Sequence, residues 1–157
     1  MTEPTHRSLV VDTSAAVAVI LGEPGSDELA ACLDDALARL MPAAIRVELG
    51  IVIEARLWPA GQDVVDRFLR DAKVDIVPVD ADLAALAMSG WRRYGQGRHP
   101  AGLNFGDCFT YTLAERTGHP YCAPATTSPR RISPWCALGP RRTRPRLHRS
   151  SGPPGAG

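Results

Sequence analysis

Residues 8–21 read SLVVDTSAAVAVIL, an apolar run that meets an acid and then changes its pattern. The stretch Ser8–Asp12 is short, apolar and largely β-branched, which favours a buried strand. Asp12 and the Thr-Ser pair after it are typical of a helix N-terminus, so we expect a helix through about Leu21. Asp12 therefore stands at the carboxyl end of a strand, the edge at which open α/β sheets bind ligands.

The alternation of strands and helices continues to about residue 120, which indicates an α/β fold with a parallel sheet. The helix at 42–57 has apolar side chains on more than one side, so we expect it to be largely buried. The length of 157 residues suits one domain. The expected helices are 12–21, 26–40, 42–57, 61–72, 80–94 and 105–117, and the expected strands are 8–12 and 74–79.

Residues 121–157 differ in composition from the rest of the chain. They hold seven arginines, seven of the 14 prolines and no acid, whereas residues 1–120 hold 17 Asp+Glu and 11 Lys+Arg. The net charge of +1 therefore divides into −6 and +7. Such a change marks a boundary, and residues 123–157 show no sustained periodicity. We expect a folded domain at 1–120 and a basic, Pro/Arg-rich disordered tail at 121–157.

Several classes of protein are disfavoured by what the sequence lacks. No apolar run approaches the roughly 18 residues of a membrane span, and the first ten residues lack the apolar core of a secretory signal. The four cysteines form no CxxC pair, so neither a zinc site nor a redox motif is indicated. We therefore expect a cytoplasmic protein with no membrane partner.

Three carboxylates stand in unusual settings: Asp12 at the end of a strand, Glu48 within an apolar helix, and Asp107 in the first turn of the last helix. Carboxylates that share a cleft raise one another's pKa values, and a divalent cation removes that penalty. Their hard oxygen ligands suit Mg²⁺, with Mn²⁺ as an alternative. Such a metal polarises a phosphodiester and activates water, so the expected chemistry is hydrolysis of a nucleic-acid backbone.

Each acid also has a purely structural interpretation. Asp12 could serve only as a helix cap, and Asp107 could complete a capping interaction with Asn104 three residues earlier. Glu48 could extend to solvent at the rim of its helix. The spacing of the acids leaves both interpretations open.

Four segments of the chain resemble PIN domains, and in particular the VapC-type toxins. They are Val10–Val17, Pro42–Leu49, Asp80–Gly95 and Gly97–Phe109, the last of which (GRHPAGLNFGDCF) is the most specific. The resemblance extends over residues 8–120. It implies a three-layer α/β/α fold with a parallel sheet.

The resemblance also implies roles for individual residues. Asp12, Glu48 and Asp107 would be the first three catalytic acids, with Asp12 and Asp107 contacting Mg²⁺ most directly and Glu48 helping to hold the metal or its water. Ser14 and Asn104 would orient these acids. The function implied is that of the toxic component of a type II toxin–antitoxin system, an endoribonuclease. The partners implied are an RNA substrate, a VapB-type antitoxin and a second copy of the chain in a homodimer.

The chain departs from the family pattern in two places. Pro42 and Arg46 occupy a neighbourhood where the family often has Ser or Thr, and we expect Arg46 to pair with an acid, contact phosphate or remain solvated. The larger departure is at the C-terminal end, because the family continues into a strand and a further acidic motif, whereas this chain has no acid after Glu115. We therefore expect the C-terminal strand region to be missing or disordered.

A shift of reading frame near residue 121 explains the second departure. Residues 121–133 (YCAPATTSPRRIS) can be encoded by GC-rich codons, and the 17 arginines against one lysine indicate a GC-rich genome. Read from the third base of the Tyr121 codon, those bases give LRTGDDFAATDI, the ending that the family predicts. We therefore interpret residues 121–157 as translated out of frame.

Two other functions remain in competition with the nuclease. The altered end could leave a noncatalytic remnant that only binds an antitoxin. A phosphatase could use Asp12 as its nucleophile, but such enzymes usually have another Asp two positions later, where this chain has Ser14.

Overall fold

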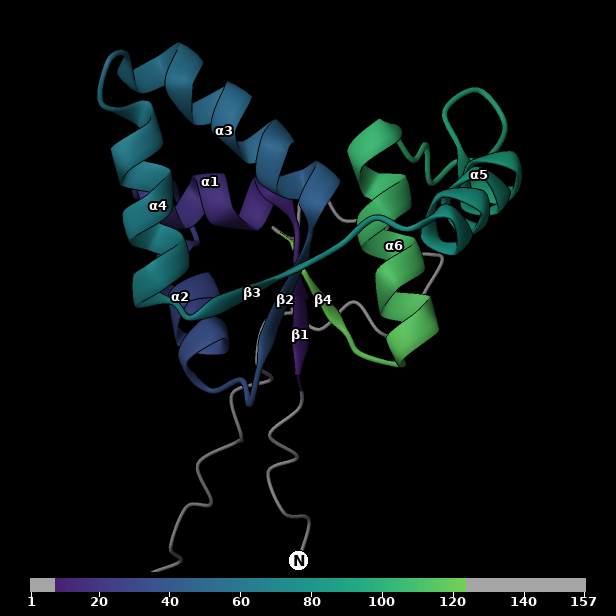
Figure 1. Cartoon of the computed structure of the whole chain (residues 1–157), viewed down its shortest axis with the longest axis horizontal. Helices are drawn as coiled ribbons and strands as arrows, with labels where there is room; N and C mark the ends of the chain where they lie inside the picture. Colours follow the sequence, from purple (N-terminus) through teal and green to yellow (C-terminus); the bar gives the residue numbers. More distant parts are fainter. Residues whose placement is uncertain (1–7, 124–157) are drawn as a thin grey trace, which may run out of the picture.

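Residues 8–123 are the part of the chain that the structure, a computed structural model, describes. They form a parallel sheet with helices on both sides, as the sequence predicts (Figure 1). No helix among these residues is both long and apolar enough to cross a membrane. In chain order the elements are β1 (Leu9–Val11), α1 (Thr13–Leu21), α2 (Ser26–Asp34), β2 (Arg39–Pro42), α3 (Ala43–Leu57), α4 (Gly61–Asp71), β3 (Val74–Val77), α5 (Ala81–Tyr94), α6 (Phe105–Thr117) and β4 (Tyr121–Cys122).

The sheet has the strand order β3-β2-β1-β4, and all its neighbouring strands are parallel. Helices α1 to α4 lie on one side of it and α5 and α6 on the other (Figure 1). Because the strands are parallel, their carboxyl ends meet at one edge. The loops that follow β1 and β2 and the first turn of α6 are all found at this edge, which is where the candidate site forms.

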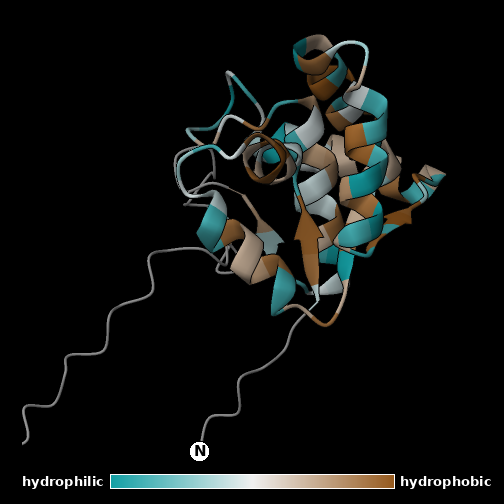
Figure 2. Ribbon diagram, turned by 90° about the vertical axis from the view of Figure 1, so that its left-hand side faces the viewer, coloured by the Kyte–Doolittle hydropathy of each residue, from teal (hydrophilic) through white to brown (hydrophobic). Residues whose placement is uncertain are grey.

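Helices cover both faces of the sheet, so β1 is fully apolar and buried, whereas the edge strand β3 is partly exposed and contains Asp75. Leu9 and Val11 pack into the larger core with α1 and α3, whereas Val10 faces α5 and α6 and packs against Leu83 and Leu113. In Figure 2 the strands are largely brown, while the helices carry both brown and teal stretches. The sheet is therefore the middle layer of three.

The predicted helix at 26–40 is wrong in its second half. Helix α2 ends at Asp34, and Arg39–Pro42 forms strand β2 between β1 and β3. Arg39 donates from Nε to the carbonyl of Leu33 at 2.6 Å and from Nη2 to that of Asp34 at 3.1 Å, so it satisfies two carbonyls at the end of the helix. A short apolar run can be a buried strand or a helix, and periodicity alone does not separate the two.

The expectation that the helix at 42–57 is largely buried is also wrong. Ile45, Leu49 and Ile53 of α3 are fully buried, but Val47 and Ile51 are 61% and 66% exposed. Only one stripe of the helix faces the core, because α3 covers the sheet from outside and is not enclosed by other helices within the described chain.

The helices at 61–71, 81–94 and 105–117 agree with the prediction to within one residue. A short strand also continues the sheet after α6: β4 pairs with β1 through Val10–Tyr121 and Val11–Cys122. The sheet therefore keeps one strand in the region where the sequence indicated a loss. The remainder of the predicted tail, residues 124–157, lies outside the described residues.

Candidate active site

Asp12 ends β1 and caps α1, and its side chain is held by hydrogen bonds at both oxygens. Oδ1 accepts from Thr110 Oγ1 of α6 at 2.7 Å, and Oδ2 accepts from the hydroxyl and the amide of Ser14 at 2.6 and 3.2 Å. The residue is only 5% exposed. A carboxylate with this little freedom is fixed in direction before any ligand arrives.

Asp107 lies in the first turn of α6 and forms a capping box with Asn104. The amide of Asn104 donates to Asp107 Oδ2 at 3.0 Å, and the amide of Asp107 donates to Asn104 Oδ1 at 2.8 Å. The pKa of Asp107 is raised to about 6, mainly by burial and also by the charges of Asp12 and Glu48, whereas the hydrogen bond from the Asn104 amide acts in the opposite direction. The negative charges of both other predicted acids therefore act on Asp107.

Glu48 approaches the site from α3 and rests against the backbone of α6. Its Oε2 accepts a hydrogen bond from Thr13 Oγ1. A Cβ added to Gly106 would lie 2.5 Å from Oε2 and 2.8 Å from Oε1 of Glu48. Only glycine leaves room for the carboxylate at this position, so Gly106 lets α3 and α6 bring their acids together.

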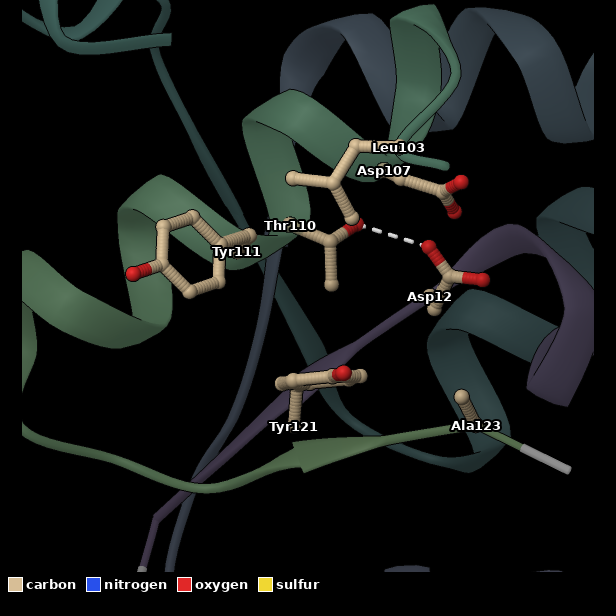
Figure 3. Close-up of a pocket in the computed structure, with 7 residues that line it drawn as sticks. All are labelled: Asp12, Leu103, Asp107, Thr110, Tyr111, Tyr121 and Ala123. Atoms are coloured by element: carbon tan, nitrogen blue, oxygen red, sulfur yellow. Dashed lines mark hydrogen bonds between the residues drawn. The ribbon is translucent and has the colours of Figure 1, made fainter. Parts of the chain in front are cut away.

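A small pocket lies between the end of β1, the start of α6 and β4 (Figure 3). Asp12 and Asp107 direct their carboxylates into the same space, and Thr110 is bonded to Asp12 beside them. Glu48 is not among the residues that line this pocket, and within residues 8–123 no three His, Cys, Asp or Glu side chains form a group that could hold a metal ion. The lining residues are Asp12, Leu103, Asp107, Thr110, Tyr111, Tyr121 and Ala123.

The structure thus places four of the five residues singled out from the sequence in two bonded pairs, Asp12 with Ser14 and Asp107 with Asn104. Two contacts were not foreseen. Thr110 follows Asp107 by three residues on a helix, so the sequence is enough to predict that the two side chains share one helix face. That Thr13 would bond Glu48, 35 residues away, had no signal in the sequence.

Arg46 forms an ion pair, which is one of the three environments that its sequence position leaves open. Its Nη2 lies 2.7 Å from Asp66 Oδ1, and Asp66 also accepts from Gln62 at 2.9 Å. The arginine therefore links α3 to α4 and is engaged away from the pocket.

Comparisons with known proteins agree with this geometry. Residues 9–121 match the PIN domain family. Ribonuclease VapC of Mycolicibacterium smegmatis is 46% identical over 112 residues, which cover 71% of this chain and 87% of that protein. Ribonuclease VapC42 of Mycobacterium tuberculosis is 42% identical over 113 residues, which cover 71% of this chain and 86% of that protein.

Among solved structures, VapC20 of Mycobacterium tuberculosis, described as a sarcin–ricin loop cleaving toxin, has the same fold. It superposes with a TM-score of 0.60 at 16% identity, over 74% of this chain and 88% of that one. The family pattern covers almost all of the described residues, and the relatives align over most of their own length. The chain belongs to the PIN domain family, among the VapC ribonucleases.

Proposed function

We propose that this chain is the toxin of a type II toxin–antitoxin system, and that it hydrolyses RNA phosphodiester bonds in the cytoplasm with the aid of Mg²⁺. The observation that carries the proposal is the pocket that Asp12, at the end of β1, and Asp107, in the first turn of α6, line together. In support, the pKa of Asp107 is raised to about 6, mainly by burial and also by the charges of Asp12 and Glu48. Carboxylates that lie close together repel one another, and a bound cation offsets this repulsion.

The donor set fits a hard divalent ion. Asp12 and Asp107 provide the charged side chains that line the pocket, and both are carboxylates. These two residues would hold Mg²⁺ or Mn²⁺ directly, because hard cations prefer oxygen ligands. The carboxylate of Glu48 accepts a hydrogen bond from the Thr13 hydroxyl. It would help to hold the metal or its water either through a bridging water molecule or after this hydrogen bond breaks.

The chain's own residues do most of the positioning. Thr110 and Ser14 hold the two oxygens of Asp12 from opposite sides, and the capping box holds Asp107. When bound, a divalent cation polarises a phosphodiester and lowers the pKa of water. Occupation of the site requires Asp107 to be ionised, so the residue releases its proton as the site fills.

The names of the relatives support a ribonuclease, and VapC20 is described as a toxin that cleaves the sarcin–ricin loop. For this chain we propose RNA as substrate and a VapB-type antitoxin as partner. We further propose that the chain forms a homodimer. The particular RNA is a separate question from the chemistry, which depends only on the acids and the metal.

The C-terminal end bears on how active the chain is. The family match stops at residue 121, and the aligned regions cover 86–87% of the relatives' lengths. Both facts are in keeping with a frameshift near residue 121 and a PIN domain, at 1–120, that is incomplete. The in-frame ending would supply the acidic Gly-Asp-Asp-Phe segment, so we expect lower activity than in an intact relative.

The proposal is tested by incubating end-labelled RNA with the full chain in Mg²⁺, in Mn²⁺ and in a chelator. We expect cleavage with the metals and none with the chelator. Asp12→Asn should lower the rate by more than about a hundredfold, because it removes a direct ligand. Asp63→Asn, a matched loss of one exposed carboxylate on α4, should leave the rate unchanged.

Cleavage in the chelator, or undiminished cleavage by Asp12→Asn, would contradict the proposal. The altered end favours one competing function, a noncatalytic remnant that only binds an antitoxin. Capture of the antitoxin by a chain that cleaves no RNA with either metal would establish that alternative.

A further inference from the structure

Three arginines gather where α5 ends and the loop to α6 begins. Arg92 and Arg93 are in the last turn of α5, and Arg98 is in the loop. All three are exposed, and none takes part in an ion pair found among residues 8–123. The segment 83–106 contains no Asp or Glu, so no carboxylate nearby in the chain offsets these charges.

This arginine cluster is positively charged, whereas the described chain as a whole is negatively charged. Residues 8–123 hold 16 Asp+Glu against 10 Lys+Arg, a net charge of −6. The other group of exposed cations, Arg67 and Arg70 on α4, is interspersed with Asp63, Asp66 and Asp71. A polyanion is therefore repelled by most of this surface and attracted at the arginine cluster.

The loop that carries Arg98 is held by its own backbone. The amide of Gln96 donates to the carbonyl of Leu103 at 3.1 Å, and the amide of Leu103 donates to that of Tyr94 at 2.9 Å. The amide of Arg98 donates to the carbonyl of Gly95 at 3.0 Å, and Gly97 turns the chain at a φ of +75°. A loop tied in this way presents its side chains in a fixed direction.

The guanidinium of Arg98 is itself fixed by an aromatic ring. Its central carbon lies 4.3 Å from the centroid of the Trp91 ring. A guanidinium over an aromatic ring is attracted to the ring face and still has N–H groups that can donate to an anion. The contact therefore reduces the side-chain entropy that is lost when a phosphate binds.

The arginine cluster is connected to the pocket through two short contacts. Leu103, the residue that closes the loop by bonding Tyr94 and Gln96, also lines the pocket. The ring of Tyr94 packs edge to face on that of Tyr111, another lining residue, with centroids 5.4 Å apart. In Figure 1 the loop lies at the end of the molecule where α6 begins, and Asp107 is in the first turn of that helix.

We propose that Arg92, Arg93 and Arg98 form the surface on which the RNA backbone docks, beside the bond to be cleaved. The proposal rests on the function proposed above. The contacts are to phosphates, so they position the RNA without reading its bases. Each arginine that meets a phosphate displaces condensed counterions from the RNA, which makes binding dependent on salt.

The test measures binding separately from cleavage. The full chain carrying Asp12→Asn is titrated with a labelled single-stranded RNA oligonucleotide at several KCl concentrations. The same protein is then compared with Arg93→Gln/Arg98→Gln and with the matched control Arg67→Gln/Arg70→Gln, which removes the same charge from α4. Residues 124–157 contribute seven arginines to every variant, so only the difference between variants reports on the arginine cluster.

We expect the slope of log Kobs against log salt to decrease in magnitude by about 1.4 when two phosphate contacts to single-stranded RNA are lost. The control should keep the slope of its parent. Arg92→Gln/Arg93→Gln leaves the Arg98–Trp91 stack intact and should give a similar decrease, which guards against damage to the loop.

Equal slopes for the cluster variants and the control would overturn the docking surface. So would unchanged RNA binding together with weaker binding to an acidic peptide, because the cluster would then serve a protein partner. If the slope decreases as expected but the chain with its native Asp12 cleaves no RNA in Mg²⁺ or Mn²⁺, the docking surface stands and only the proposed hydrolysis is contradicted.

Discussion

Replacement of Gly106 by alanine should separate the position of Glu48 from the stability of the fold. The new Cβ would lie 2.5 Å and 2.8 Å from the two oxygens of Glu48, closer than unbonded atoms can approach. The glutamate is the end of a flexible side chain, so it moves and the helix does not. In moving it gives up the hydrogen bond from Thr13.

Two opposing contributions decide the size of the effect. A hydrogen bond to a charged group contributes about 1.5–3 kcal/mol. Alanine in a helix is favoured over glycine by about 1 kcal/mol. The expected net loss in the free energy of unfolding is therefore about 0.5–2 kcal/mol, small beside the roughly 5–15 kcal/mol of a typical domain. Affinity for Mg²⁺ should fall by about ten- to a hundredfold, because the new Cβ pushes the Glu48 carboxylate away from α6 and it can no longer help to hold the metal or its water.

A double-mutant cycle of urea unfolding at pH 7 measures this directly. In a Glu48→Ala background no carboxylate opposes the new Cβ, so Gly106→Ala should stabilise the chain by up to about 1 kcal/mol. Gly90→Ala on α5 is the control, since a Cβ there meets its nearest neighbours at an ordinary 3.4 Å. The same change in unfolding free energy in both backgrounds would refute the contact between Gly106 and Glu48.

Three further outcomes are expected. The pKa of Asp107 rises from 3.8 to about 6 on folding, so the folded chain binds the proton more tightly than the unfolded chain. The metal-free protein should therefore lose stability as pH rises through that range. Asp107→Asn should flatten that part of the curve of Tm against pH. Parallel curves would contradict this. Thr110→Val removes the 2.7 Å bond to Asp12 at a position only 2% exposed and should cost about 1.5–3 kcal/mol in urea unfolding, whereas Thr110→Ser should retain most of it. Equal stabilities of the two variants would count against the bond. A chain whose frame is restored after residue 120 to LRTGDDF should melt higher by roughly 5 °C or more and cleave RNA faster. An unchanged cleavage rate would remove the frameshift as the cause of any low activity, and an unchanged Tm would contradict its effect on stability.

The helices that the sequence predicts well are those with capping residues at their ends. Asp80 accepts from the amide of Leu83 at 2.7 Å and begins α5, Asn104 begins α6, and Gly118 ends α6 in the left-handed region. These signals act within a few residues, so they can be read without knowledge of the fold. Strand β2 has no such signal, since it is a strand only because β1 and β3 lie on either side of it.

The same distinction applies to the site. Asp12 and Asp107 could be found because each follows a local rule: one ends a buried strand and the other lies in a helix's first turn. The position of Glu48 depends on how closely α3 approaches α6, and that distance is set by Gly106 and by the packing of both helices. The hydrogen bonds from Thr13 to Glu48 and from Thr110 to Asp12 likewise join residues 35 and 98 positions apart. The periodicity of the sequence cannot predict contacts over such separations.

The structural and catalytic interpretations of the acids describe the same geometry. Asp12 caps α1 and Asp107 closes a capping box, yet both carboxylates line the pocket. The amide of Asn104 lowers the pKa of Asp107 while burial, Asp12 and Glu48 raise it, so the cap limits the repulsion that the cluster creates. Helix N-termini favour negative charge, and this lets the fold keep two acids together before a cation binds. A cation then competes with one proton on Asp107, which predicts that metal affinity increases as pH rises through about 6.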